Sequence, residues 1–361
     1  MSNLTFVQEP SLRYISLFSG IGGFEQAIHK EYPDADCIGF SEIDPYAVKI
    51  YKSHFPGHTN MGDVTKITKK KIRHLVSRFG CDLIVGGFPC TNLSSLANIQ
   101  GNSEGLKGPK SGLFYDMIKI IEYAKSVNSK VKFIIENNFS MKKVYREAIT
   151  TTLKEKFGDV YSRVINNADF GVQSRKRIIW TNFPFKGATN TCTQTWNDVL
   201  EPFDKVQDYK LSDRMVQCLN RTGDYKNSRG FTKIAMPTSK GRYRFENIET
   251  NLQKSRWDIQ SRSDNMSHQM YDCYPVGKSR PITTGYGGGK NALIDRRKGK
   301  SDRKYSSFIF RSFTPTELER LFGLPDGYTD VDNMSNTRRT FALGNSVPVF
   351  IAHHVVKQLS V

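Results

Sequence analysis

The sequence predicts an α/β fold: a doubly wound, mostly parallel sheet, with a smaller irregular domain inserted before the C-terminal helix. Short, continuous apolar runs alternate with amphipathic stretches through the first half of the chain, and such runs are typical of buried parallel strands. Their alternation with helical stretches predicts a sheet covered by helices on both faces. Beyond about residue 182 the apolar runs give way to glycine, serine, asparagine and basic residues, which predicts the second, irregular domain.

The expected elements follow one another in a regular order. The strands are the short apolar runs 13–18, 37–43, 82–88, 132–137, 161–166 and 175–180. The helices are the amphipathic stretches 23–30, 45–54, 69–79, 113–126, 141–156 and 347–359. Thr314, Pro315 and Glu317 form a capping-box pattern, which predicts a further helix start. The domain boundaries that follow are 1–187 for the regular domain, 188–327 for the irregular domain, and 328–361 for a segment that returns to the first domain.

The net charge indicates the kind of partner. The 361 residues include 53 Lys and Arg against 35 Asp and Glu, a net charge of +18, and more than half of the excess falls within residues 186–305. Phosphates attract such cations through counterion release, so nucleic acid is the expected partner, a merely solubilising surface being the alternative. No apolar run or N-terminal layout fits a membrane helix or a signal peptide, and no C-x-x-C pair indicates zinc. We expect a cytoplasmic monomer that binds neither membrane nor metal.

The first turns predict a nucleoside site. The turn FSGIGGFE (18–25) lacks the third glycine of the G-x-G-x-x-G pattern, which argues against a dinucleotide cofactor. Glu42, at the end of the second strand, is placed to accept ribose hydroxyls, and Asp63, after a further expected strand, to accept an adenine amino group. Tight turns and helix caps are the ordinary alternatives for each. Together these residues favour an adenosine-bearing cofactor without phosphates, and S-adenosylmethionine fits.

Two further strand ends carry candidate catalytic groups. GGFPCTNLS (86–94) places Cys90 just past a strand, where doubly wound folds bind ligands; a thiol there is a candidate nucleophile or a buried inert cysteine. Glu136 ends the next strand and could hydrogen-bond the ring nitrogen and amine of cytosine. Three polar residues alternate along the last strand and are expected to share one face, as part of the substrate pocket or of a salt-bridged edge: Gln173, Arg175 and Arg177.

These segments occur in a specific order along the chain. FSGIGGFE, GDV, GGFPC, ENN, QSRKR and LGNSVP follow one another, and with this set the chain resembles the DNA cytosine carbon-5 methyltransferase family over residues 13–183 and 308–361. The layout is similar to bacterial and phage modification methylases. The stretch 322–335 additionally resembles the animal de novo methyltransferases. Two positions depart from the family pattern: Thr91 stands where the family has Gln, and Asn138 where it has Val.

The resemblance implies a class I, Rossmann-like fold and methyl transfer from S-adenosylmethionine to carbon 5 of a cytosine flipped out of double-stranded DNA. It implies covalent attack by Cys90, with Glu136 at ring nitrogen 3 and Arg175 at the carbonyl oxygen of the base or orienting both groups. The implied cofactor-binding residues are Phe18, Gly20, Gly22, Glu42, Ile43, Asp63, Val64, Pro89, Leu113, Asn345, Ser346 and Val347. Residues 188–327 are implied to choose the DNA sequence.

Candidate DNA contacts lie in a glycine-rich segment and in the basic run after it. Threonine side chains and exposed backbone suit the major groove, and arginines suit phosphates, although a plain glycine-rich hairpin is the alternative. The candidates are Gln173, Arg280, Thr283, Thr284, Gly285, Arg296 and Arg297.

Two other functions fit the same fold. An RNA cytosine methyltransferase is one, but relatives of that kind carry Cys-Phe-Thr after the glutamate strand, and residues 139–141 include no cysteine. A catalytically inactive DNA-binding regulator is the other, and the presence of Cys90, Glu136 and Arg175 argues against it. An amino-group methyltransferase would have Asp- or Asn-Pro-Pro-aromatic in place of GGFPC.

Replacing Arg296, Arg297, Lys298 and Lys300 with glutamine is expected to weaken binding to DNA of every sequence. Each lost phosphate contact lowers the number of released counterions, so the logarithm of the affinity should fall less steeply with salt. Duplex affinity measured over a range of salt concentrations checks this. A salt slope equal to that of the unaltered protein would show that the run does not contact phosphates.

Overall fold

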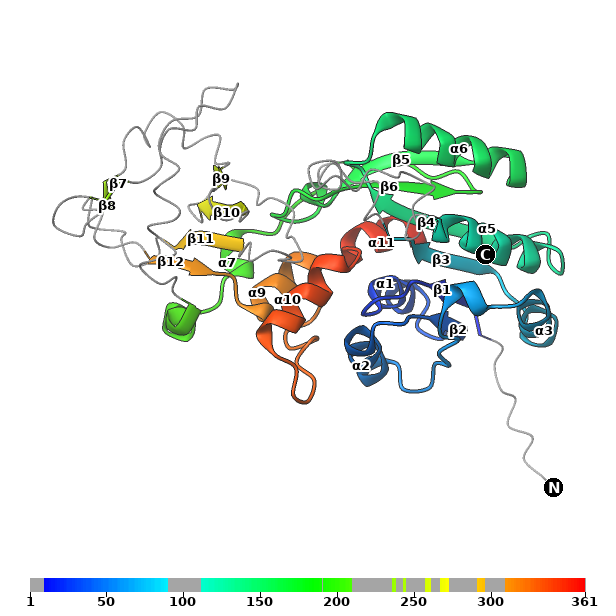
Figure 1. Cartoon of the computed structure of the whole chain (residues 1–361), viewed down its shortest axis with the longest axis horizontal. Helices are drawn as coiled ribbons and strands as arrows, with labels where there is room; N and C mark the ends of the chain where they lie inside the picture. Colours follow the sequence, from blue (N-terminus) through cyan, green and yellow to red (C-terminus); the bar gives the residue numbers. More distant parts are fainter. Residues whose placement is uncertain are drawn as a thin grey trace. The chain divides into compact units, whose positions relative to one another are not determined.

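The computed structural model describes residues 10–89, 112–189, 191–209 and 309–360, and the backbone of the short strands between 236 and 295 (Figure 1). The chain divides into two compact units. The first consists of Met1–Asp169, Lys176–Thr189 and Ser346–Val361, and the second of Phe170–Arg175 and Asn190–Asn345. In this division the segment that returns to the first unit begins at Ser346.

The first unit contains the elements predicted for the regular domain. In chain order they are β1 (Arg13–Leu17), α1 (Gly23–Glu31), β2 (Asp36–Ser41), α2 (Pro45–His54), the 3-10 turn η1 (Val64–Lys66), α3 (Lys69–Phe79), β3 (Leu83–Gly87), α5 (Leu113–Lys125), β4 (Lys132–Asn138), α6 (Lys143–Phe157), β5 (Tyr161–Asn166), the 3-10 turn η3 (Asn167–Asp169), β6 (Lys176–Thr181) and α11 (Val349–Val356). Within the described ranges no helix is both long and apolar enough to cross a bilayer.

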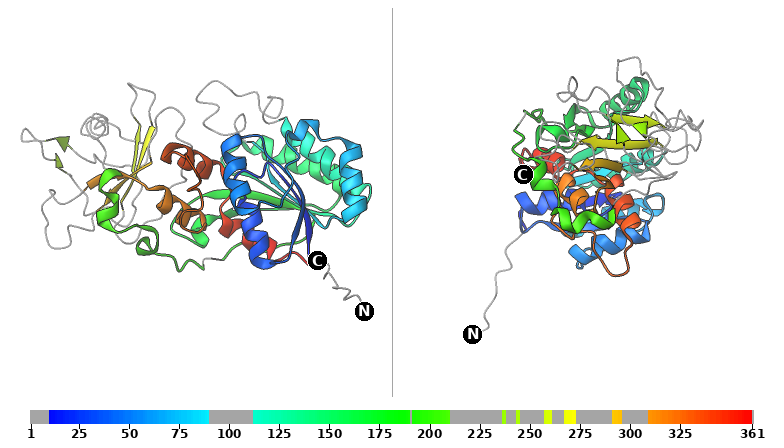
Figure 2. Two further views of the ribbon diagram at one scale, coloured as in Figure 1. Left: turned by 90° about the horizontal axis from the view of Figure 1, so that it is seen from below. Right: turned by 90° about the vertical axis from the view of Figure 1, so that its left-hand side faces the viewer.

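The strands form one sheet in the order β2-β1-β3-β4-β6-β5, with helices on both faces (Figure 2). β2, β1, β3 and β4 run parallel, and β6 is antiparallel to both of its neighbours. This confirms the doubly wound, mostly parallel α/β fold. The prediction of a further strand before Asp63 is wrong. Among the described residues there, a single isolated bridge forms between Phe40 and Asn60, and the chain then enters η1 at Val64.

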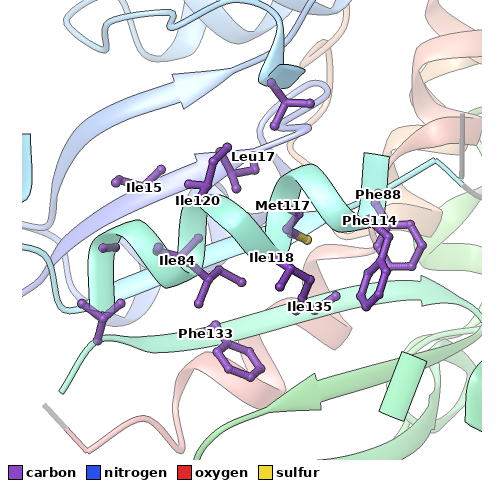
Figure 3. Close-up of a cluster of buried hydrophobic side chains, with 14 of the residues drawn as sticks. Ile15, Leu17, Ile84, Phe88, Phe114, Met117, Ile118, Ile120, Phe133 and Ile135 are labelled. Atoms are coloured by element: carbon purple, nitrogen blue, oxygen red, sulfur yellow. The ribbon is translucent and has the colours of Figure 1, made fainter. Parts of the chain in front are cut away.

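A continuous apolar layer joins the sheet to α5 (Figure 3). Ile84 of β3 and Phe114 and Met117 of α5 are fully buried in it. A Cβ atom on Gly86 would lie 2.5 Å from the Cε of Met117, so glycine at this position lets the helix lie directly on β3. Each fully buried large side chain contributes about 1.5–3 kcal/mol, which makes this layer the main stabilising element of the unit.

The last residues of the chain complete the first unit. α11 packs along α1, and the hydroxyl of Tyr32 donates to the carbonyl of Leu359 at 2.8 Å. A Cβ atom on Gly23 would lie 2.7 Å from the carbonyl oxygen of Val347 and 3.0 Å from the Oγ of Ser346. The two ends of the chain therefore meet at the start of α1, where only glycine leaves room.

The described part of the second unit contains two buried ion pairs. Its described elements are α7 (Trp196–Val199), η4 (Phe203–Tyr209), β7 (Met236–Pro237), β8 (Tyr243–Arg244), β9 (Trp257–Gln260), β10 (Ser267–Asp272), β11 (Asn291–Asp295), β12 (Ile309–Ser312), α9 (Pro315–Phe322) and α10 (Asn336–Asn345). Glu317 pairs with Arg311 at 2.7 Å with both side chains fully buried, and Thr314 and Glu317 form the predicted capping box. Glu319 pairs with Arg339 of α10 at 3.1 Å.

Gly23→Ala is expected to lower the free energy of unfolding by about 1–3 kcal/mol, because the added methyl group displaces Ser346 and Val347. Denaturant unfolding of the purified protein measures the change. Gly57→Ala is the matched control, since a Cβ atom there meets nothing within 4 Å. Equal effects of the two substitutions would contradict the contact.

Candidate active site and cofactor site

The strand order brings the predicted site residues to one edge of the sheet. β2, β1, β3 and β4 are parallel neighbours, so their carboxyl ends lie on the same side. Phe18, Glu42 and Pro89 follow three of these strands, and Glu136 lies near the end of the fourth. In open α/β sheets ligands bind in the crevice outside the carboxyl ends of the strands, so this edge is the candidate site.

The glycine turn after β1 is tied to the end of β2. The backbone N–H of Gly20 donates to Oε2 of Glu42 at 2.9 Å, and the other oxygen accepts from Ile43 N at 2.8 Å and Asp44 N at 2.9 Å. Gly20 and Gly22 have φ of 55° and 91°, in the left-handed region where glycine is favoured. Phe18 has a φ of 54°, uncommon for a residue with a side chain and frequently found at functional sites.

The glycine turn is open on the side of Gly20. A Cβ atom built on Gly20 meets nothing within 4 Å, so the turn faces open space. The carboxylate of Glu42 can accept ribose hydroxyls there. Ile43 is 69% exposed, an apolar side chain suited to packing against a purine.

Asp63 and Asn60 lie in the loop between α2 and η1. Asp63 accepts from the backbone N–H of Thr65 at 2.9 Å and caps η1, and these hydrogen bonds lower the pKa of its carboxyl. Val64 beside it is buried. Asn60, which the sequence analysis missed, donates to the carbonyl of Glu42 at 3.0 Å and thereby fixes the loop to β2. The only sequence signal for Asn60 was its place shortly before GDV.

The remaining predicted cofactor residues lie at helix starts and at the C-terminal return. Leu113 begins α5 and is partly buried against the apolar layer. Ser346 is buried and lies with Val347 against Gly23. Asn345 is exposed and is the last residue of the second unit.

Glu136 forms an ion pair with an arginine of the neighbouring strand. Nε of Arg177 in β6 lies 2.6 Å from Oε1 of Glu136 in β4, and the two side chains are 9% and 12% exposed. β4 and β6 are antiparallel neighbours, with Arg177 opposite Asn138. A carboxyl group that is nearly buried and paired with a guanidinium in this way has a fixed orientation.

The end of β3 is fitted closely to this carboxyl. A Cβ atom on Gly87 would lie 2.5 Å from Oε2 of Glu136, so Gly87 leaves the room that the carboxylate occupies. The side-chain amide of Asn137 donates to the carbonyl of Phe88 at 2.9 Å, and both residues are buried. These contacts fix the backbone that leads through Pro89 to Cys90. Cys90 itself lies outside the described residues, as do Thr91 and the segment up to residue 111.

The structure corrects the prediction for the QSRKR segment. β6 begins at Lys176, so Gln173, Arg175 and Arg177 do not share one strand face. Nε of Arg177 pairs with Oε1 of Glu136 at 2.6 Å, and Nη2 of Arg175 donates to the carbonyl of Gly344 at 2.7 Å. Gln173 is fully buried, and its role as a DNA contact stays a prediction. Alternation places side chains on one face only within a strand.

The other candidate DNA contacts cannot be placed on the fold. They lie outside the described residues, and they are Arg280, Thr283, Thr284, Gly285, Arg296 and Arg297.

Comparison with known proteins decides the family. The family model for C-5 cytosine-specific DNA methylases matches residues 12–361, nearly the whole chain. The chain belongs to this family. The DNA methylase is 28% identical to the type II methyltransferase M1.ScrFI of Lactococcus lactis subsp. cremoris, over 96% of this chain and 77% of that protein. It is 26% identical to M.NlaX of Neisseria lactamica, a type II methyltransferase, over 96% of each chain.

Solved structures support the fold of the DNA methylase. The S. pombe Dnmt2 methyltransferase superposes with a TM-score of 0.63 and 18% identity, over 95% of this chain and 96% of that one. The family assignment makes the protein an S-adenosylmethionine-dependent methyltransferase that acts on carbon 5 of cytosine in DNA.

The DNA methylase buries a carboxyl behind its glycine turn. Glu25, in the first turn of α1, is fully buried, and its Oε1 accepts from the hydroxyl of Tyr51 at 3.0 Å. The same hydroxyl lies 2.9 Å from Nδ1 of His58. Burial raises the pKa of Glu25 from 4.5 to about 7, although hydrogen bonds from Ser16 and Tyr51 act in the opposite direction. Near neutral pH the carboxyl therefore gains or loses a proton.

The raised pKa of Glu25 predicts a pH-dependent stability. Between pH 4.5 and 7 the unfolded state loses this proton while the folded state keeps it, so this carboxyl makes the free energy of unfolding fall as the pH rises. The free energy of unfolding of Glu25→Gln, relative to that of the unaltered protein, should therefore rise by about 3 kcal/mol from pH 4.5 to pH 8. Denaturant unfolding at both values measures it, with the exposed Glu155→Gln as control. A stability difference that does not change with pH would contradict the prediction.

Proposed function

We propose that the protein is a DNA (cytosine-5-)-methyltransferase that works through a covalent adduct between Cys90 and a cytosine flipped out of a specific duplex sequence. One observation carries the proposal: the Glu136–Arg177 ion pair lies against Gly87, three residues before Cys90. Family membership supplies the reaction, and this geometry supports the roles of the residues. A base within a duplex cannot enter such a site, so extrusion costs a few kcal/mol of unstacking.

Cys90 and Glu136 act on opposite sides of the same ring. The thiolate of Cys90 adds to carbon 6, and the Glu136 carboxyl holds a proton at ring nitrogen 3, so that the electron pair of the 5,6 double bond becomes available at carbon 5. S-adenosylmethionine, when bound, supplies the methyl group that carbon 5 accepts. Loss of the carbon-5 proton then restores the double bond and expels Cys90 as a thiolate.

Arg177 takes the part that the sequence analysis gave to Arg175. Its Nε already pairs with Glu136 and its Nη1 donates to the carbonyl of Lys176 at 2.9 Å, and its guanidinium would donate a further hydrogen bond to the carbonyl oxygen of the base. An arginine that contacts both the acid and the base would fix the angle between them. Misplacement of a reacting group by about 1 Å can cost about a hundredfold in rate.

The cofactor is held at the neighbouring strand ends. Glu42 would accept the ribose hydroxyls, Phe18 and Ile43 would contact the adenine, and the backbone of Gly20 would approach the cofactor closely. Ser346 and Val347 would support the methionine part from the C-terminal return. The open space at Gly20 and the exposure of Ile43 support these roles.

The biological setting follows from the relatives. Type II methyltransferases of bacteria and the orphan methyltransferase M.SPRI of Bacillus phage SPR are among them. We infer a role in a restriction-modification system or in phage self-protection, exercised by a cytoplasmic monomer, with the second unit choosing the DNA sequence. The excess of basic residues in 186–305 supports this part of the proposal.

Expression in a bacterium without cytosine methylation is expected to leave 5-methylcytosine at one short motif, detected by bisulfite sequencing. Cys90→Ala should abolish the modification, and Glu136→Gln should lower the rate in purified enzyme by roughly 10²–10⁴-fold, because a proton is no longer held at the ring. Cys192→Ala, at a cysteine of the second unit, is the matched control and should leave the motif methylated. Methylation that persists in Cys90→Ala would overturn the proposal.

A further inference from the structure

Arg175 makes two contacts within the second unit. Its Nη2 donates to the carbonyl oxygen of Gly344 at 2.7 Å, and its guanidinium lies over the ring of Phe322, 4.9 Å from the centroid. The side chain is 3% exposed, and Gly344 and Phe322 are buried. A charged donor on a buried carbonyl and a desolvated cation–π contact are both strong for their class, so Arg175 holds the end of α10 firmly.

These contacts lie at two points where the chain passes between the units. The chain leaves the second unit after Arg175 and again after Asn345, the residue that follows Gly344. Two residues beyond Arg175 is Arg177, which pairs with Glu136. Directly beyond Asn345 are Ser346 and Val347, which pack on Gly23. The hydrogen bond from Arg175 to Gly344 thus joins the two segments of the second unit close to the points where each continues into the first unit.

We propose that Arg175 is a positioning residue for cofactor binding. By holding Gly344 it fixes the backbone path along which Asn345 leads into Ser346 and Val347. This inference rests on the cofactor site proposed above. This role differs from contact with the base, because the backbone that Arg175 fixes leads into Ser346 and Val347, which pack against Gly23 beside the glycine turn.

The contact at Gly23 makes the turn sensitive to this backbone path. The carbonyl oxygen of Val347 lies only 2.7 Å from the position of a Cβ atom on Gly23, and the Cγ1 of Val347 lies 2.9 Å from it. Atoms packed this closely cannot shift independently, so a shift of residues 346–347 moves the start of α1 or opens a gap beneath it. Gly22 caps α1, and the N–H of Gly20 is bonded to Glu42, so the shift would reach the ribose site.

The test measures S-adenosylmethionine affinity of the whole protein by calorimetry without DNA, where no base is present. Arg175→Gln is expected to weaken binding about tenfold, since it loses both the charge-assisted bond and the stacking. Arg175→Lys keeps the charge and should lose less. Phe322→Leu should weaken binding in the same direction, because it removes the ring beneath the guanidinium. In steady-state kinetics the KM for S-adenosylmethionine should rise more than kcat falls.

Two controls separate the possible outcomes. Arg163→Gln also removes an arginine that donates to a backbone carbonyl, that of Phe185 at 2.8 Å, and should leave cofactor affinity unchanged. Glu42→Gln should weaken it; if it does not, the proposed cofactor site itself is wrong. If Glu42→Gln weakens binding and Arg175→Gln lowers kcat alone, Arg175 acts on the base and the inference is overturned. Thermal unfolding monitors folding, and if Arg175→Gln is unfolded, Arg175→Lys and Phe322→Leu decide the question.

Discussion

The close contact between Val347 and Gly23 is the constraint on which the architecture depends. Because the carbonyl of Val347 occupies the place that a side chain on Gly23 would need, the C-terminal residues form part of the same unit as β1 and α1. The irregular region must then be an insertion, which leaves the first unit after Thr189 and rejoins it at Ser346. The start of α1, next to the glycine turn, is consequently shaped by residues from both the N-terminal and the C-terminal part of the first unit.

The surroundings of Glu136 depend in the same way on one reversed strand. β6 runs antiparallel to β4, which brings Arg177 from a distant segment to Glu136, while parallel β3 brings Gly87 to the other side of the same carboxyl. The carboxyl of Glu136 is therefore enclosed by two neighbouring strands and paired with Arg177. Its orientation is built into the sheet, and rigid elements hold such groups more precisely than loops do.

Most of the first unit could be predicted from the sequence because its strands are continuous apolar runs, and α2 and α3 begin and end as expected. α10 was missed because its buried face includes Arg339, whose charge is balanced by Glu319 from α9, a contact that periodicity cannot reveal. Gln173 and Arg175 were placed on the strand face because the strand was expected to extend back past them, whereas β6 begins at Lys176. Cys90 rests on its motif alone, since it lies outside the described residues.

Asn138 shows how a departure from the family pattern can be tolerated beside the catalytic glutamate. An apolar residue there would need no hydrogen bond, whereas a buried amide without partners costs about 1–3 kcal/mol. In this chain Asn138 is only partly buried, and its Oδ1 accepts from the backbone N–H of Ser140 at 3.0 Å. The side chain thus closes the turn after β4, while Asn137, fully buried, holds Phe88. Because the polar group is satisfied locally, the carboxyl of Glu136 keeps its contact with Arg177, and the substitution need not disturb the catalytic pair.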